Sequence, residues 1–183
     1  KIMPVKGLND NASGFSSNLA KAVIYAAENG ADVISNSWGG SFNQTSADAF
    51  AYAYSLGCVN LAGAGNTNVD TSGFFPAGLN TVIAVAAVNA FDVKASFSNW
   101  GNKVDVSAPG VRILSLRAQG TDIYGDGTHI VGTNYYWASG TSMACPYAAG
   151  VAALVLSKFP VSTMDEIQAV LRSSVDPHDD AGL

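Results

Sequence analysis

Apolar and polar residues alternate along the first third of the chain in a pattern that predicts strands and helices in turn. Two segments carry apolar side chains at helical spacing, begin near Ser or Thr and end at Gly. Short, nearly continuous apolar runs lie before, between and after them. This order is typical of a parallel sheet covered by helices, whose strands are buried on both faces. The expected strands are 1–8, 31–37 and 58–65, and the expected helices are 16–30 and 45–57, the second with Thr45 or Ser46 as its N-cap.

The second half of the chain predicts shorter strands, then a hairpin and two helices. The helix at 140–159 carries small residues on several sides and is therefore expected to be buried. The helix at 162–174 opens with Ser162 and Asp165, which resemble a capping box. We interpret the whole chain, 1–183, as one α/β domain. The expected strands are 81–88, 94–99, 103–109 and 112–117, followed by an irregular hairpin at 119–137.

Composition and charge exclude several classes of partner. The chain has 183 residues, of which 13% are charged and 19 are Gly, which favours a compact body with many tight turns. The net charge is −5 and Lys and Arg form no run, so neither nucleic acid nor an anionic membrane surface is an expected partner. The longest apolar stretch, at 148–156, is shorter than the ~20 residues of a membrane span.

The cysteines and the chain ends add two expectations. Cys58 and Cys145 are far apart in the sequence and form neither a disulfide framework nor a metal motif, so we expect free thiols. The chain has no initiator Met and no signal peptide, and it ends on "DDAGL" without a closing element. We interpret it as a piece of a longer protein.

Ser142 is the strongest candidate for a reactive residue. It lies in "SGTSMA", at the expected start of the helix at 140–159. A serine at a helix start usually serves as a cap. Here, however, Gly140 and Ala144 leave room around the hydroxyl, and the N-terminal end of a helix favours a developing anion. Ser142 is therefore a candidate nucleophile.

Four motifs together resemble the subtilisin-like serine proteases, the subtilases, and they occur in the family's order. They are "NSWGG" at 36–40, "GAGN" at 63–66, "SFSNWGNKVDVSAPG" at 96–110 and "SGTSMACP" at 139–146 with the apolar helix after it. The resemblance covers about residues 1–175. It implies a three-layer α/β fold, with a mostly parallel sheet between helices and the N-terminal part missing, and it implies a serine endopeptidase.

The resemblance implies roles for two residues in catalysis. Ser142 would be the nucleophile, and Asn66 would stabilise the oxyanion together with the backbone N–H of Ser142. Taken alone, Asn66 could also be an ordinary turn residue between Gly65 and Thr67. "GAGNTN" also resembles a dinucleotide-binding loop in part, although the third glycine is missing.

The resemblance also implies a site for an extended peptide. Two segments would hold the peptide backbone between them as added β-strands: Ala12, Ser13 and Gly14 on one side, and Ser37, Trp38 and Gly39 on the other. The pocket for the substrate side chain before the scissile bond would lie between residues 37–39 and the run of Gly63, Ala64 and Gly65. Phe74, directly before Phe75-Pro76, would form the base of this pocket and make it shallow.

A cation site is implied less strongly. Relatives bind a cation through carbonyls after the Pro and one carboxylate, and the matching residues here are Asn80, Val82 and Asp105. Oxygen ligands of this kind suit a structural Ca²⁺, although one carboxylate gives little affinity and an empty or Na⁺-filled site is an equal expectation. Catalysis itself needs no cofactor.

The chain departs from the family where the catalytic base should be. Subtilases carry the triad in the order Asp, His, Ser, but the family's "D-[ST]-G" and "H-G-T-H" motifs are absent here. "DGTH" at 126–129 has Asp in place of the catalytic His and lies between the "APG" and serine motifs. We therefore interpret His129 as a loop residue, and His178 as part of a polar tail. Tyr147 stands where the family often has His, outside the triad.

These departures set the expectations for function. The parent protein is expected to be a secreted endopeptidase that acts on polypeptides, with a propeptide as a possible partner. The chain alone is expected to be inactive or nearly so, and to expose an apolar sheet edge that favours aggregation. Two alternatives remain open: a peptide-binding module without catalysis, and a nucleotide-binding α/β domain that uses Gly63–Asn66.

Overall fold

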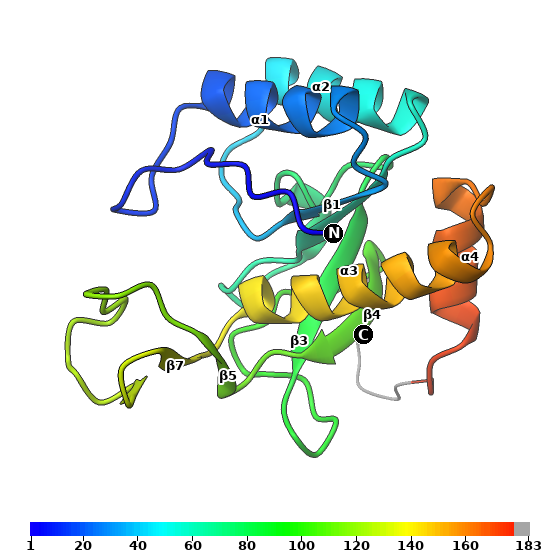
Figure 1. Ribbon diagram of the computed structural model, residues 1–183. Helices are drawn as coiled ribbons and strands as arrows, with labels where there is room; N and C mark the ends of the chain where they lie inside the picture. The colour runs from blue at the N-terminus through cyan, green and yellow to red at the C-terminus, as the bar shows by residue number, and fades with distance from the viewer. Residues whose placement is uncertain (178–183) are drawn as a thin grey trace.

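Four parallel strands form the centre of the fold (Figure 1). In this computed structural model, residues 1–177 are described, and the strand order is β1-β2-β3-β4. Every residue of β2 and of β3 is buried, which explains their continuous apolar runs. The parallel α/β sheet predicted from these runs is confirmed. The strands are β1 (Val33–Asn36), β2 (Val59–Gly63), β3 (Ile83–Val88) and β4 (Val104–Pro109).

Helices cover both faces of this sheet and create two cores. In Figure 1, α1 and α2 lie side by side on one face, and α3 crosses the other. Val59, Leu61 and Val85 point toward α3 and α4, whereas Ala62 and Ala84 point toward α1 and α2. This alternation along β2 and β3 gives the three layers that the sequence predicts. The helices are α1 (Ser16–Glu28), α2 (Gln44–Ser55), α3 (Thr141–Lys158) and α4 (Met164–Ser173).

A small antiparallel sheet lies beside the start of α3 (Figure 1). Its order is β5-β7-β6, and it includes the segment predicted as an irregular hairpin. Asp122 fixes the loop of this hairpin: its carboxylate accepts hydrogen bonds from the Tyr136 hydroxyl (2.8 Å) and from the amides of Gly125 (3.0 Å) and Gly127 (2.8 Å). The Tyr136 hydrogen bond is the main reason that the pKa of Asp122 is lowered. The strands are β5 (Ile113–Leu116), β6 (Ile130–Val131) and β7 (Tyr135–Ala138).

Two predicted strands are absent from the described residues. Residues 1–8 form no strand, because no described strand pairs with them. Residues 94–99 form no ladder either, apart from one isolated bridge between Val88 and Lys94. Single hydrogen bonds hold this second segment instead: the Ser98 hydroxyl accepts the Ala87 amide at 3.0 Å, and the Ala95 amide donates to the Ala87 carbonyl at 2.8 Å. The sequence pattern therefore overestimated the number of strands.

Helix α1 begins at Ser16 as predicted, but the predicted caps of α2 and α4 are wrong by one to three residues. The N-cap of α2 is Asn43, whose side-chain oxygen accepts the Ser46 amide at 3.0 Å, and neither Thr45 nor Ser46 takes this role. In α4 the capping box is formed by Thr163 and Glu166. Ser162 and Asp165, which we expected to form it, each lie one residue too early. The side chain nearest to the free amides decides the cap.

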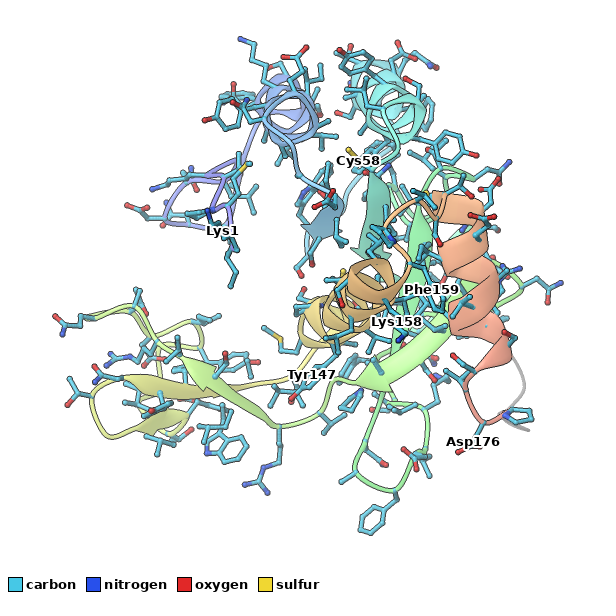
Figure 2. All side chains as sticks on the ribbon, turned by 45° about the vertical axis from the view of Figure 1, so that its right-hand side comes forward. Lys1, Cys58, Tyr147, Lys158, Phe159 and Asp176 are labelled. Atoms are coloured by element: carbon cyan, nitrogen blue, oxygen red, sulfur yellow. The ribbon has the colours of Figure 1, made fainter. Side chains whose placement is uncertain are left out.

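Helix α3 is less buried than its composition predicts. Tyr147, Val151 and Leu154 are 49%, 47% and 70% exposed, so one side of the helix is open. Figure 2 shows Tyr147 on α3 and Phe159 where this helix ends beside α4. Within residues 1–177, no helix meets the length and apolarity required to cross a bilayer.

Replacing Thr163 by Ala tests the capping box of α4. Thr163 Oγ1 accepts the Glu166 amide at 3.2 Å, and Glu166 Oε2 accepts the Thr163 amide at 2.8 Å. Losing the cap should cost about 1 kcal/mol of unfolding free energy and lower Tm by about 2–4 °C in calorimetry. Ser162→Ala is the matched control and should leave Tm unchanged. Equal effects of the two substitutions would contradict the assignment.

Candidate active site

The start of α3 is bonded directly to the loop after β2. Thr141 Oγ1 accepts a hydrogen bond from the Gly65 amide at 3.1 Å and donates one to Asn66 Oδ1 at 3.0 Å. The Thr141 amide donates to the same Asn66 oxygen at 2.8 Å. Because these bonds hold the amide oxygen of Asn66, they also fix the direction of its nitrogen, Nδ2.

Two N–H groups border one open space beside Gly140. A Cβ atom on Gly140 would lie 3.4 Å from Asn66 Nδ2 and 3.6 Å from the backbone nitrogen of Ser142. Among residues 1–177, no acceptor is found for Asn66 Nδ2, and Ser142 lies in the first turn of α3, where amides have no intrahelical partner. Two donors that face the same space provide the geometry of an oxyanion hole.

The hydroxyl of Ser142 is partly exposed at this space and contacts the end of β1. It donates to the Ser37 carbonyl at 3.3 Å, and the Ser37 hydroxyl donates to the Ser142 carbonyl at 2.8 Å. Within the part of the chain that the structure describes, no imidazole or carboxylate is bonded to this hydroxyl. A serine nucleophile needs a base within hydrogen-bond reach, so residues 1–177 in this conformation do not activate Ser142.

His129 pairs with Asp126 but not with Ser142. Its Nδ1 lies 3.2 Å from Asp126 Oδ1 and 3.0 Å from Thr128 Oγ1, and its ring lies 4.4 Å from that of Tyr124. The Thr128 amide and then His129 lower the pKa of Asp126. A catalytic His uses its two ring nitrogens for two different partners, whereas here both contacts fall on Nδ1. His178, the other histidine, lies outside the described residues.

The two segments expected to hold a peptide differ in what they offer. Residues 37–39 continue β1 beyond its last paired residue. Trp38 packs its ring against those of Phe50 and Phe75, with ring centroids 5.8 and 6.2 Å apart. On the other side, the Ser13 amide donates to Asn9 Oδ1 (3.0 Å), and the Ser13 carbonyl accepts the Asn9 amide (2.8 Å). Ser13 therefore offers neither backbone group to an added strand in this conformation.

Phe74 fills the space between the two segments that would line the side-chain pocket. A Cβ atom on Gly39 would lie 2.5 Å from the Phe74 ring, and one on Gly65 would lie 3.1 Å from it. The ring therefore contacts both segments closely, and both need glycine at these positions. Space for a large substrate side chain is accordingly small.

Asn99 supports the Asn66 loop and was not identified from the sequence. Its side chain is fully buried; Nδ2 donates to the Ala64 carbonyl at 2.9 Å, and Oδ1 accepts the amides of Thr67 (3.0 Å) and Val69 (3.2 Å). These bonds hold the backbone on both sides of Asn66. The only sequence signal was a polar residue inside the motif at 96–110, and this signal did not specify a role.

Both cysteines are free, as expected, and the structure shows that both are buried. Burial raises the pKa of Cys145, whose Sγ lies 3.5 Å from the Ser35 hydroxyl. Burial also raises the pKa of Cys58, which lies between α2 and β2 (Figure 2) and donates to the Ala31 carbonyl at 3.1 Å. A raised pKa keeps the thiols protonated at neutral pH, so neither is a good nucleophile.

Two of the three residues expected to bind a cation, Val82 and Asp105, are already bonded to an ammonium group. Lys103 Nζ donates to the Val82 carbonyl at 3.0 Å and to Asp105 Oδ2 at 3.3 Å. The other Asp105 oxygen accepts hydrogen bonds from Gln168 and Arg172. Asn80 is exposed. Residues 1–177 also contain no group of three or more His, Cys, Asp or Glu that could hold a metal. This arrangement does not fit a calcium ion.

The glycine-rich turn after β2 does not have the form of a nucleotide site. The next element is a short 3₁₀ helix, η1 (Thr71–Gly73), so no α-helix begins at this turn. The Gly65 amide, moreover, already donates to Thr141. A dinucleotide site needs a helix N-terminus after the glycines to bind the phosphates.

Comparisons with known proteins identify the family of this chain. The sequence model of the Subtilase family matches residues 1–183. The chain is 45% identical over 159 residues to the Thermophilic serine proteinase of Bacillus sp. strain AK1, covering 86% of this chain and 36% of that protein. It is 37% identical over 187 residues to the Extracellular protease of Xanthomonas campestris pv. campestris, covering 95% of this chain and 31% of that protein.

A solved structure gives the same result for the fold. The crystal structure of a cold adapted subtilisin-like serine proteinase superimposes with a TM-score of 0.82 at 31% identity, over 96% of this chain and 61% of that one. The chain thus spans between about one third and three fifths of the length of these relatives. Since both the family model and the fold extend over nearly all of its residues, the chain belongs to the subtilase family.

Proposed function

We propose that this chain supplies the nucleophile and the oxyanion hole of a serine endopeptidase. The observation that carries the proposal is the pair of donors, Asn66 Nδ2 and the Ser142 amide, that border one space beside Gly140. Membership of the subtilase family supports the same conclusion. Residues 1–183 would then be one part of a peptidase domain.

In the proposed reaction, Ser142 Oγ attacks the carbonyl carbon of a peptide bond while a base takes its proton. The carbonyl oxygen becomes negatively charged, and the N–H groups of Asn66 and Ser142 donate hydrogen bonds to it. The base returns the proton to the leaving amine, and water then hydrolyses the acyl group from Ser142. The base is supplied from outside residues 1–177, because no described residue reaches the hydroxyl. Donation by a neutral amide suits this step, since it places no charge beside the uncharged substrate.

The proposed substrate is an extended polypeptide with a small side chain before the scissile bond. Among the described residues no strand pairs with 37–39, and although the Ser37 carbonyl accepts the Ser142 hydroxyl, Trp38 and Gly39 offer backbone groups that can bond to any peptide. The Phe74 ring occupies the space where a large side chain would enter. Residues 12–14 would take part once Ser13 releases its bonds to Asn9.

The place of action and the partners follow from the same proposal. One relative is named an extracellular protease, and we infer that the protein containing this chain acts outside the cell. A propeptide that binds the same strand edge as a substrate would be a fitting partner. Nothing in the negative net charge favours nucleic acid.

A second function is favoured by the unactivated serine. Since no described residue acts as a base for Ser142, the chain could belong to a module that binds peptides without cutting them. The two functions differ in whether Ser142 becomes reactive in the protein that contains this chain.

Labelling with a fluorophosphonate tests the activation of Ser142. In the protein that contains this chain, Ser142 should react quickly, and Ser142→Ala should abolish labelling. The 183-residue chain alone should react at least about 10⁴-fold more slowly, because the base is missing. Mass spectrometry of the labelled peptide measures both rates.

Two results would contradict parts of this proposal. Rapid labelling of the 183-residue chain would mean that it contains a base, and His129→Ala and His178→Ala would then identify which histidine acts. A protein that contains the chain but binds peptides without reacting at Ser142 would be the binding module.

Asn66→Ala tests the oxyanion hole. Removing one donor should lower kcat by about 10²–10³-fold with little change in KM, because the bond forms only in the transition state. Steady-state kinetics on a peptide substrate measure this effect. Asn68→Ala, in the same loop, is the control and should keep most of the activity. A similar loss in both variants would mean that the loop, rather than the donor, was damaged.

Phe74→Gly tests the pocket. Removing the ring should open the space beside Gly39 and Gly65 and raise kcat/KM for substrates with Phe or Leu before the scissile bond, by about 10-fold or more relative to Ala. Competition between two peptides that differ only in this residue measures the ratio. If the unaltered protein already prefers a large aromatic residue, the shallow pocket is wrong.

A further inference from the structure

The carboxylate of Asp105 connects three elements at the amino ends of the central strands. It lies on β4, and its side chain is fully buried. One oxygen, Oδ2, accepts the Ala84 amide of β3 at 2.6 Å and Lys103 Nζ at 3.3 Å. The other, Oδ1, accepts Gln168 Nε2 at 2.7 Å and a bond from Arg172, both on α4. Every lone-pair direction of the carboxylate therefore has a donor.

Of the two cationic side chains that bond to Asp105, that of Lys103 is the more buried. Its side chain is only 16% exposed, whereas that of Arg172 is 51% exposed. Its ammonium group also bonds the carbonyl of Val82, a fully buried residue, at 3.0 Å. The lysine thus joins a carbonyl and a carboxylate that come from two different segments, which is what a bound cation would do.

From this geometry we propose that the ammonium group of Lys103 is a built-in cation that makes this site independent of metal. Ca²⁺ needs six to eight oxygen ligands at about 2.3–2.6 Å. Here the Val82 carbonyl oxygen and Asp105 Oδ2 already accept hydrogen bonds from Lys103 Nζ. Lys103 and Arg172 together carry two positive charges against the one negative charge of Asp105. A divalent ion placed among them would be repelled and would have to displace the lysine.

The built-in cation stabilises the attachment of α4 and of the loop before β3. Removing it leaves the Val82 carbonyl without its donor and takes one of two cations from a fully buried carboxylate. Uncompensated buried charge and unpaired buried carbonyls are both strongly destabilising. A covalently attached ammonium, unlike a metal ion, is not lost to chelators or by dilution.

Lys103→Met removes the charge and keeps the length of the side chain. In the presence of EDTA, Tm should fall by about 4–8 °C, whereas Lys103→Arg should recover part of this loss. Lys21→Met is the matched control, because Lys21 is exposed on α1 and no ion pair or side-chain hydrogen bond of it is found within residues 1–177. Calorimetry on the protein that contains this chain gives the four values. If Lys103→Met has the same Tm as Lys21→Met, the proposal is overturned.

Calcium provides the second test. CaCl₂ should raise the Tm of Lys103→Met more than that of the unaltered protein, because only the variant has a free carbonyl and carboxylate oxygen. Calcium sites elsewhere in a longer protein add equally to both values and cancel in the difference. A calcium increment in the unaltered protein equal to or larger than that in the variant would overturn the proposal.

A third measurement needs no variant and stays informative if Lys103→Met fails to fold. Acetylation by an amine-reactive ester, followed by mass spectrometry, reports the exposure of each lysine. Lys103 should react several-fold more slowly than Lys21, and calcium should leave this ratio unchanged. Reaction of Lys103 as fast as Lys21, or exposure of Lys103 by calcium, would show that the ammonium is not held at Asp105.

Discussion

The geometry of the site depends on the close contact between the start of α3 and the carboxyl end of β2. Gly63 permits this contact, since a Cβ atom there would lie 2.9 Å from Thr141 Oγ1 and 3.0 Å from the Thr141 backbone. Any side chain at Gly63 would therefore push the helix away. With the helix in place, Thr141 binds the oxygen of Asn66, and the next residue along the helix is Ser142. One contact thus aligns Ser142 with Asn66, the residues proposed as nucleophile and oxyanion donor, although Asn66 and Thr141 lie 75 positions apart in the sequence.

The sequence predicted the central fold well because burial leaves a strong local pattern. Strands β2 and β3 are buried on both faces; β3 is an unbroken apolar run, and β2 is interrupted only by the buried Asn60. The same reasoning failed at residues 1–8, an apolar segment without a partner strand in the described chain, and the mostly polar segment at 94–99 forms no ladder there either. The predicted caps of α2 and α4 lie within three residues of the observed ones. Several polar side chains are neighbours at these two helix starts, and only the three-dimensional position of a side chain decides which one bonds the free amides.

The candidate site was predicted in part for a related reason. Ser142 and Asn66 lie in short motifs, so adjacent residues indicated their chemistry. Asn99 and Thr141 act through contacts with segments that are distant in the sequence, and their letters alone do not distinguish them from surface residues. The role of Lys103 was also not predicted. In the sequence, Lys103 and Asp105 resemble an exposed ion pair, and only the bond from Lys103 to the Val82 carbonyl shows that the lysine is held inside the protein.

Two buried polar side chains, Asn99 and Asp105, bond to segments at opposite ends of the sheet. The contacts that attach α4 therefore lie at one end and the candidate site lies at the other. Asn99 binds the backbone of the Asn66 loop at the carboxyl ends of the strands, where open α/β sheets place their sites. Asp105, the second residue of β4, does the same for α4 and β3 at the amino ends. Because rigid, fully bonded strands lie between them, a change of cation at Asp105 acts on the attachment of α4 and leaves the bonds that orient Asn66 in place. The cation proposed at Lys103 therefore acts at the end of the sheet opposite the candidate site.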